Sequence, residues 1–128
     1  MKEPYWLTLE ECLALHDMML SQYGGLAGLR DEGLLRSALA KPKQLFHYGK
    51  PTLATLAAAY TAGIVRNHPF LDGNKRTGFM MGAGFLERNG DMFDATEAEA
   101  ALFTLALAAG EMTEPAYADW LAANSRRD

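Results

Sequence analysis

The feature that most constrains the fold is an uncharged run of fifteen residues, from Pro51 to Val65, that is apolar almost all round a helix. A helix without a polar face is usually surrounded by other helices. The run is shorter than the roughly 20 residues that a membrane span needs. It therefore predicts a buried helix from about Thr52 to Asn67 in a soluble protein.

Composition predicts one domain over residues 1–128, because 49% hydrophobic and 22% charged residues are ordinary globular values. Twelve basic and sixteen acidic side chains argue against a general nucleic-acid binder. A single cysteine, Cys12, favours a reducing compartment. Acidic residues stand where a signal peptide would have its apolar core. We expect a cytoplasmic protein with no direct contact to nucleic acid or membrane.

Helix signals occur on both sides of the central run. Thr8 and Glu11 form a capping-box pattern that opens a helix ending at Gly24-Gly25. Asp31 can cap a second helix through Ala40, and Pro42 is expected to end it. The ten-residue stretch "PKQLFHYGKP" would then be a connection, long enough to suggest a functional loop.

Two more helices are expected in the C-terminal part, and no alternating strand of useful length is visible. One opens with a second capping-box pattern, Thr96 and Glu99, and stops at Gly110. The last runs from about Thr113 to Asn124. The sequence predicts an all-α fold, a compact bundle of about six helices around a buried central helix pair.

The second helix of that pair should run from about Asn74 to Gly90. Its interior contains Gly78, Gly82 and Gly84, each costing roughly 1 kcal/mol relative to alanine in a helix. We expect compensation through close backbone approach to a neighbour such as the alanine-rich helix before it.

The stretch "NHPFLDGNKRTGF", residues 67–79, joins the two central helices. Lys75 and Arg76 fall in the first turn of the second helix, where the helix dipole disfavours cations. The unpaired N–H groups of that turn form an anion site suited to phosphate. One interpretation is that both cations point to solvent at a cost of a few tenths of a kcal/mol. We favour the other, that they contact a bound polyphosphate.

Four further residues of this stretch are candidates for the site or for shaping the loop. Asp72 is either a helix cap or a magnesium ligand, since Mg²⁺ on nucleotide phosphates takes only one or two protein carboxylates. His68 is either an ordinary helix-end histidine or a general base. Phe70 is expected to anchor the loop in the core. Asn74 either caps the helix or fixes the shape of the loop.

Other residues are weaker candidates. His16 lies on the apolar stripe of the first helix and is expected to be a core residue. The three histidines lack the short spacing of a zinc site. A P-loop is excluded, because Gly49-Lys50 is followed by Pro51 where serine or threonine would be needed.

Residues 68–76, "HPFLDGNKR", resemble the Fic motif, H-x-F-x-[DE]-G-N-[GK]-R. With the following threonine they look more narrowly like the Doc (death-on-curing) branch of the Fic/Doc family, short helical toxins of bacterial toxin–antitoxin pairs. The flanking stretches "YGGLAGLRDEGLLRSALAKP" and "FLERNG" are also similar to that branch. The resemblance covers roughly Leu7 to Leu121.

The resemblance implies a nucleotide-dependent transferase that modifies a protein hydroxyl, with ATP and Mg²⁺ as cofactors. His68 would take the proton from the hydroxyl, Asp72 would hold Mg²⁺, and Phe70 would pack beneath the loop. The phosphate-binding residues would be Gly73, Asn74, Lys75 and Arg76.

The group transferred depends on two positions. Fic enzymes that transfer AMP have glycine at the Lys75 position and a second arginine at the Phe79 position. The Doc branch shares the lysine, and it is associated with reversed ATP binding and transfer of the γ-phosphate to a threonine of elongation factor Tu. The resemblance therefore implies a protein kinase that inhibits translation. AMP transfer, or a non-catalytic subunit bound to its antitoxin, are the alternatives.

Regulation is expected to come from a partner. Fic-type proteins are often restrained by an [ST]-x-x-x-E-[GN] helix, but Gly28 stands where Ser or Thr should precede Glu32-Gly33. We expect an antitoxin, Phd-like or other, to bind in trans as a helix in an apolar groove. The stretch "PKQLFHYGKP" matches the family's target-docking flap. An ordinary loop is the alternative for its residues Phe46, His47 and Tyr48.

Overall fold

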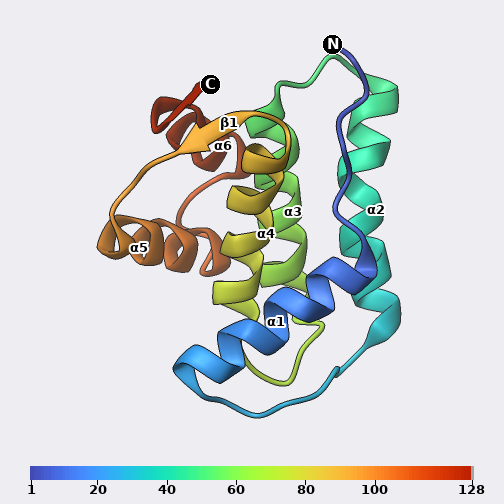
Figure 1. The fold of residues 1–128 in the computed structure, drawn as a ribbon, viewed down its shortest axis with the longest axis vertical. Coiled ribbons are helices and arrows are strands. Elements are labelled where there is room, and N and C mark those ends of the chain that lie inside the picture. Colours follow the sequence, from blue (N-terminus) through green and yellow to red (C-terminus); the bar gives the residue numbers. More distant parts are fainter. Residues whose placement is uncertain (128) are drawn as a thin grey trace.

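The computed structural model describes residues 1–127, which form six helices and one two-stranded sheet (Figure 1). The elements are α1 (Leu9–Tyr23), α2 (Glu32–Tyr48), α3 (Leu53–Asn67), α4 (Asn74–Arg88), β1 (Asp91–Phe93), α5 (Glu97–Ala108), α6 (Glu114–Ala123) and β2 (Ser125–Arg127). The predicted helical bundle is confirmed, with two short strands added to it.

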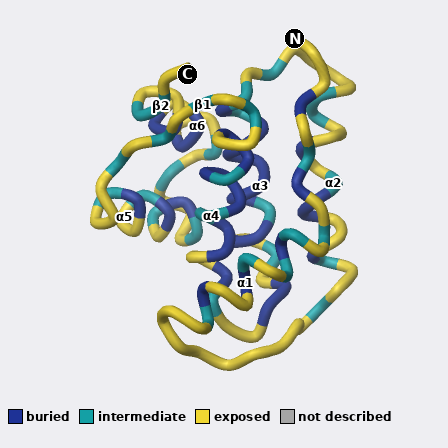
Figure 2. The backbone as a smooth tube through the Cα atoms, in the orientation of Figure 1, coloured by how far each residue is buried: buried dark blue, intermediate teal, exposed yellow. Residues whose placement is uncertain are grey.

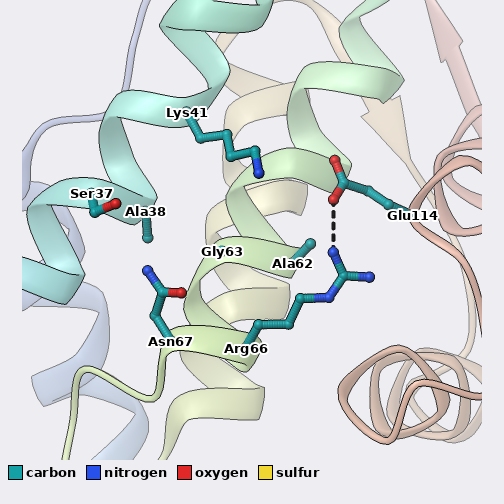
Figure 3. Close-up of a pocket in the computed structure, with 8 residues that line it drawn as sticks. All are labelled: Ser37, Ala38, Lys41, Ala62, Gly63, Arg66, Asn67 and Glu114. Carbon is teal, nitrogen blue, oxygen red and sulfur yellow. Dashed lines mark hydrogen bonds and ion pairs between the residues drawn. The ribbon is translucent and has the colours of Figure 1, made fainter.

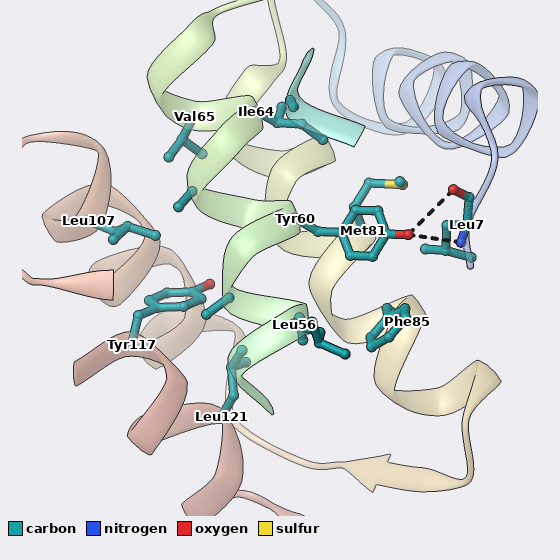
Figure 4. Close-up of a cluster of buried hydrophobic side chains, with 14 of the residues drawn as sticks. Leu7, Leu56, Tyr60, Ile64, Val65, Met81, Phe85, Leu107, Tyr117 and Leu121 are labelled. Carbon is teal, nitrogen blue, oxygen red and sulfur yellow. Dashed lines mark hydrogen bonds between the residues drawn. The ribbon is translucent and has the colours of Figure 1, made fainter. Parts of the chain in front are cut away.

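Helices α3 and α4 form the centre of the bundle, and the other helices surround them (Figures 1 and 2). From α3, Leu56 and Tyr60 face Met81 and Phe85 of α4, while Tyr117 of α6 packs on the other side (Figure 4). This burial confirms the prediction made from the uncharged run. Within residues 1–127, no helix has the length and apolar character needed to cross a bilayer.

Threonine side chains cap α1, α3, α5 and α6, and the sequence predicted the caps at Thr8 and Thr96. Thr8 and Glu11 form a complete capping box. Thr96 accepts from the backbone N–H of Glu99 at 3.1 Å, but the predicted reciprocal bond is not made. The Glu99 carboxylate instead accepts from the indole N–H of Trp120 at 2.6 Å, because tertiary packing offers it a closer donor.

The prediction that the second helix ends before Pro42 was wrong. Helix α2 continues through this proline to Tyr48, so most of the expected ten-residue connection is helical. Proline lacks the N–H that would bond the preceding turn, which disfavours it inside a helix. Pro42 is buried, and Phe46 in the next turn packs its ring 5.7 Å from that of Trp6. Burial of these side chains offsets the missing hydrogen bond.

The two strands were also missed. They pair antiparallel, from Asp91 opposite Arg127 to Phe93 opposite Ser125. Three residues are too few for an alternating pattern to stand out in a sequence. The side chain of Arg127 reinforces the pairing, because it donates to the Asp91 carboxylate at 2.9 Å.

The glycines of α4 allow the central helices to approach closely. A Cβ at Gly82 would clash with the Thr61 hydroxyl and lie 3.0 Å from the carbonyl oxygen of Ala57. The Thr61 hydroxyl also donates to the carbonyl of Gly78 at 2.7 Å. The expected close approach is confirmed at Gly78 and Gly82. It is wrong at Gly84, where the nearest side-chain atom would be 3.9 Å from a Cβ.

Two alanine substitutions separate this close approach from helix propensity. Gly82→Ala should lower the free energy of unfolding by about 1–3 kcal/mol, because the methyl group forces α3 and α4 apart. Gly84→Ala has room for the methyl group and should raise it by up to about 1 kcal/mol. Urea denaturation measures both. Equal effects of the two substitutions would contradict the packing described here.

Candidate active site

The loop of residues 68–73, called here the motif loop, connects α3 to α4 at the end of the central pair that lies beside α1 (Figure 1). His68 terminates α3 in a left-handed conformation with φ of 51°, and its N–H donates to the carbonyl of Ile64 at 3.1 Å. A non-glycine residue rarely adopts this conformation. The turn leaves the His68 imidazole exposed on the wall of a cavity.

Asn74 fixes the shape of the motif loop. Its buried amide accepts from the N–H of Phe70 at 3.0 Å and donates to the carbonyl of the same residue at 2.9 Å. These two bonds decide between the two sequence interpretations in favour of loop shaping. The amide nitrogen also lies 3.3 Å from Nδ1 of His68. Because an amide NH₂ can only donate, Nδ1 carries the lone pair in this contact.

Phe70 anchors the loop in the core. Its side chain is 1% exposed and stacks on the ring of His16, with the centroids 3.7 Å apart and the planes 9° from parallel. His16 is buried as predicted, but it also contacts the motif loop directly, which sequence reasoning missed.

Asp72 does not cap α4. The N-cap is Gly73, with φ of 80° and no side-chain capping bond. The Asp72 carboxylate accepts from the N–H of Gly73 at 2.9 Å and from the N–H of Leu26 at 3.2 Å. Each oxygen keeps lone pairs free, and the side chain is exposed. The carboxylate is thus held in place and still able to bind a cation.

Lys75 and Arg76 lie exposed in the first turn of α4. Neither takes part in any ion pair of residues 1–127. The Arg76 guanidinium instead lies 4.2 Å above the centre of the Tyr23 ring. Within residues 1–127, the backbone N–H groups of Asn74, Lys75 and Arg76 also have no acceptor. Positive charge and free donors therefore gather at one helix end.

These groups line a cavity of about 650 Å³ between α1, α4 and α5. One wall is polar and carries His68, Asp72, Gly73, Asn74, Lys75 and Arg76. The rest of the lining is largely apolar and includes Tyr23, Phe79, Met80, Ala101 and Leu105, together with the polar Glu97 and Thr104. A cavity of this size, with apolar walls and a few convergent polar groups, is typical of a small-molecule site.

A second, smaller hollow of about 120 Å³ lies between α2, α3 and α6 (Figure 3). Arg66 and Glu114 pair across it at 3.0 Å, and Lys41 reaches over it. No residue of the motif loop lines this hollow, and it is too small for a nucleotide. The larger cavity is therefore the candidate active site.

Within residues 1–127 no three His, Cys, Asp or Glu side chains gather as a metal site, so a cation at the motif would depend on Asp72 and on oxygens of its ligand. Magnesium commonly binds in this way. Cys12 offers no alternative chemistry, because burial raises the pKa of its thiol to about 12 and keeps it protonated.

The connection between α1 and α2, residues 24–31, runs beside the motif loop (Figure 1). Leu29 forms a bridge with Phe70, and the carbonyl of Pro69 accepts from the N–H groups of Arg30 and Asp31 at 2.6 and 3.0 Å. Sequence reasoning missed this contact, although the glycine-rich stretch "GGLAGLR" was a signal for an irregular segment.

Arg30 of this connection holds the end of α3. Its Nε donates to the carbonyl of His68 at 2.6 Å, and its Nη2 donates to the carbonyl of Asn67 at 2.9 Å. A cation at the C-terminal end of a helix also interacts favourably with the helix dipole. Arg30 therefore stabilises the backbone conformation that exposes the His68 side chain.

The structure does not bring Phe46, His47 and Tyr48 to the cavity. They end α2 at the opposite end of the central pair from His68, with the length of α3, about 22 Å, between them (Figure 1). The segment that contacts the motif loop is the α1–α2 connection. A target-docking role for Phe46, His47 and Tyr48 stays a prediction.

Residues 6–86 match the Fic/DOC family, and this match includes the whole motif loop. The chain belongs to the Fic/Doc family. It is 38% identical over 117 residues to "Protein kinase doc" of Escherichia phage P1, covering 90% of this chain and 91% of the relative. It is 42% identical over 84 residues to "Toxin Doc" of Mycolicibacterium smegmatis, covering 60% of this chain and 64% of that relative.

The Arg30 contact predicts a difference between two surface arginines. Arg30→Ala should lower the free energy of unfolding by about 1–2 kcal/mol, because two charge-assisted bonds to backbone carbonyls are lost. Arg36→Ala is the matched control. It removes only an exposed pair with Glu32 and should change that free energy by less than about 0.5 kcal/mol. Indistinguishable urea denaturation curves for the two variants would exclude this role of Arg30.

Proposed function

We propose that this Fic/Doc protein is the toxin of a toxin–antitoxin system and transfers the γ-phosphate of ATP to a protein hydroxyl. The observation that carries the proposal is the convergence of two unpaired cations, free backbone donors and the exposed His68 on one cavity. The similarity to "Protein kinase doc" over 90% of the chain supports it.

The first turn of α4 is suited to a triphosphate. Its free N–H groups and the helix dipole attract anions, and Lys75 and Arg76 add two positive charges. Phosphoryl transfer depends mainly on positioning and on neutralising charge at the transferred group, which these residues would supply. The Arg76 side chain can leave the Tyr23 ring for phosphate, because a guanidinium binds phosphate oxygens through two parallel bonds.

His68 would act as the general base. A target hydroxyl gives its proton to the imidazole and forms a bond to the γ-phosphorus, while the bond to the β-phosphate oxygen breaks and ADP leaves. The contact with Asn74 leaves the lone pair on Nδ1. Because this contact is 3.3 Å long, exchanging it for the target hydroxyl costs little.

Asp72 is the residue that would hold Mg²⁺. Its carboxylate is exposed, oriented by two backbone N–H groups, and lies on the wall that carries the cations. A bound Mg²⁺ would neutralise phosphate charge in addition to Lys75 and Arg76. One carboxylate together with phosphate oxygens and water satisfies the usual coordination of this ion.

Kinase activity is favoured over AMP transfer by two residues on the cavity wall, Lys75 and Phe79. The AMP-transferring Fic motif has glycine and arginine there, whereas this chain has a second cation near the helix start and an apolar ring one turn later. Transfer of AMP to a protein hydroxyl is the alternative function.

The target is proposed to be a threonine of elongation factor Tu, so that the modification inhibits translation. The target would approach over the α1–α2 connection, because this segment contacts the loop that carries His68. Leu26 and Leu71 are 69% and 55% exposed beside it and offer an apolar rim.

The cognate antitoxin, Phd-like or of another family, is proposed to bind in trans. The apolar wall of the cavity continues onto α5, where Leu102 and Leu105 are 61% and 53% exposed. An amphipathic helix could bury these side chains. A non-catalytic, DNA-bound role is less favoured, because the net charge of −4 opposes direct DNA contact.

Mass spectrometry of purified elongation factor Tu tests the transferred group. After incubation with the protein, ATP and Mg²⁺, we expect a gain of roughly 80 Da for phosphate, as opposed to roughly 329 Da for AMP. His68→Ala should lower the rate by roughly 10²–10⁴. Arg36→Ala, an exposed residue of α2 that does not line the cavity, is the control and should retain the wild-type rate. A rate unaffected by His68→Ala would remove this residue from the mechanism.

The assignment to phosphate transfer is tested by the double variant Lys75→Gly, Phe79→Arg. This variant introduces the two motif residues of AMP-transferring Fic proteins. A larger share of the modified target should therefore carry the adduct of roughly 329 Da. Each single variant serves as a control in the same mass assay. If the transferred group stays the same in the double variant, these two positions do not determine it.

A further inference from the structure

His16 is a buried imidazole outside the family motif that contacts the motif loop from beneath. Its side chain comes from α1 and is 3% exposed. Its Nε2 lies 2.8 Å from the carbonyl oxygen of Asp72. A carbonyl oxygen only accepts, so Nε2 carries a proton and donates it to this bond.

The bond determines the orientation of one peptide unit. The N–H of Gly73, on the other side of the same peptide group, donates to the Asp72 carboxylate at 2.9 Å. Within residues 1–127 His16 is the one donor to the Asp72 carbonyl. The peptide is therefore held at its oxygen by His16 and at its nitrogen by the carboxylate. Rotation of this peptide would turn both the Asp72 side chain and the start of α4.

The ring of His16 is itself held in place. It stacks on Phe70 at 3.7 Å, and a Cβ added to Gly73 would lie 3.5 Å from Nε2. The imidazole thus lies against a core aromatic ring and close to Gly73, the N-cap of α4. An apolar side chain of similar size would fill this space, but it could not satisfy the carbonyl of Asp72.

We propose that His16 is a positioning residue, which orients Asp72 and the first N–H groups of α4 through its Nε2–H bond. This inference rests on the proposed function, since it assigns those groups to Mg²⁺ and phosphate. The alternative is that His16 only fills space in the core. In that case its aromatic ring would be needed, but its N–H donor would not.

Two substitutions separate the donor from the ring. His16→Phe keeps an aromatic ring against Phe70 but removes the donor, whereas His16→Gln loses the ring but keeps an amide N–H. Tyr60→Phe is the matched control, because it also removes a buried side-chain hydrogen bond, to Leu7, away from the motif loop. Thermal unfolding of each variant separates loss of fold from loss of positioning.

Two readouts are needed. In the nucleotide-free protein, ¹H–¹⁵N spectra should show a proton on Nε2 of His16, and the Gly73 amide should shift in His16→Phe more than in His16→Gln. In the kinase assay, kcat of His16→Phe should fall about 10- to 100-fold with KM for the protein target little changed, and His16→Gln should recover part of the loss. Tyr60→Phe should keep the wild-type kcat.

A proton on Nδ1 alone, or a wild-type kcat together with an unshifted Gly73 amide in His16→Phe, would overturn the proposal. If His16→Phe does not fold, two other measurements test the proposal. The wild-type protein should carry the proton on Nε2 of His16, and His16→Gln should show a kcat below that of the wild type. Absence of any transfer by the wild-type protein would instead overturn the proposed function. The nucleotide-free spectra would still test whether His16 holds the loop.

Discussion

The close packing of α3 against α4 is the constraint on which the site depends. Gly78 and Gly82 bring the two helices together, and the Thr61 hydroxyl bonds across the contact. Because both helices are buried in the bundle, the positions at which α3 ends and α4 begins are fixed. The motif loop spans a rigid gap and has few conformations available.

Three contacts then select one conformation of the loop. Asn74 bonds both backbone groups of Phe70, Arg30 holds the carbonyl end of α3, and His16 holds the carbonyl of Asp72. They come from α4, the α1–α2 connection and α1, so separate parts of the chain converge on a six-residue loop. The groups left unbonded are those at the start of α4, together with Lys75 and Arg76. A site preorganised in this way is suited to stabilising charge that develops on phosphate.

Much of the fold and of the candidate site was predictable from local sequence patterns. The uncharged run predicted the buried α3, the two threonine capping patterns predicted the starts of α1 and α5, and the motif predicted residues that line the cavity. The end of α2 was mispredicted because the hydrogen bond that Pro42 cannot make is a local feature of the sequence. The packing that compensates for it, Phe46 against Trp6, joins residues that are far apart in the chain. Arg30 and His16 could not be recognised for the same reason, since their partners lie 38 and 56 residues away. Periodicity identified His16 as buried, but it could not identify the carbonyl that His16 contacts.

The proposed function depends on a triphosphate site at the start of α4. A crystal structure with Mg²⁺ and a non-hydrolysable ATP analogue tests this claim most directly. We predict phosphate oxygens against the free N–H groups of the first turn, with Lys75 and Arg76 turned toward them and the metal ion on Asp72. A nucleotide bound elsewhere, or a cavity that stays empty at saturating nucleotide while both cations remain in solvent, would contradict it.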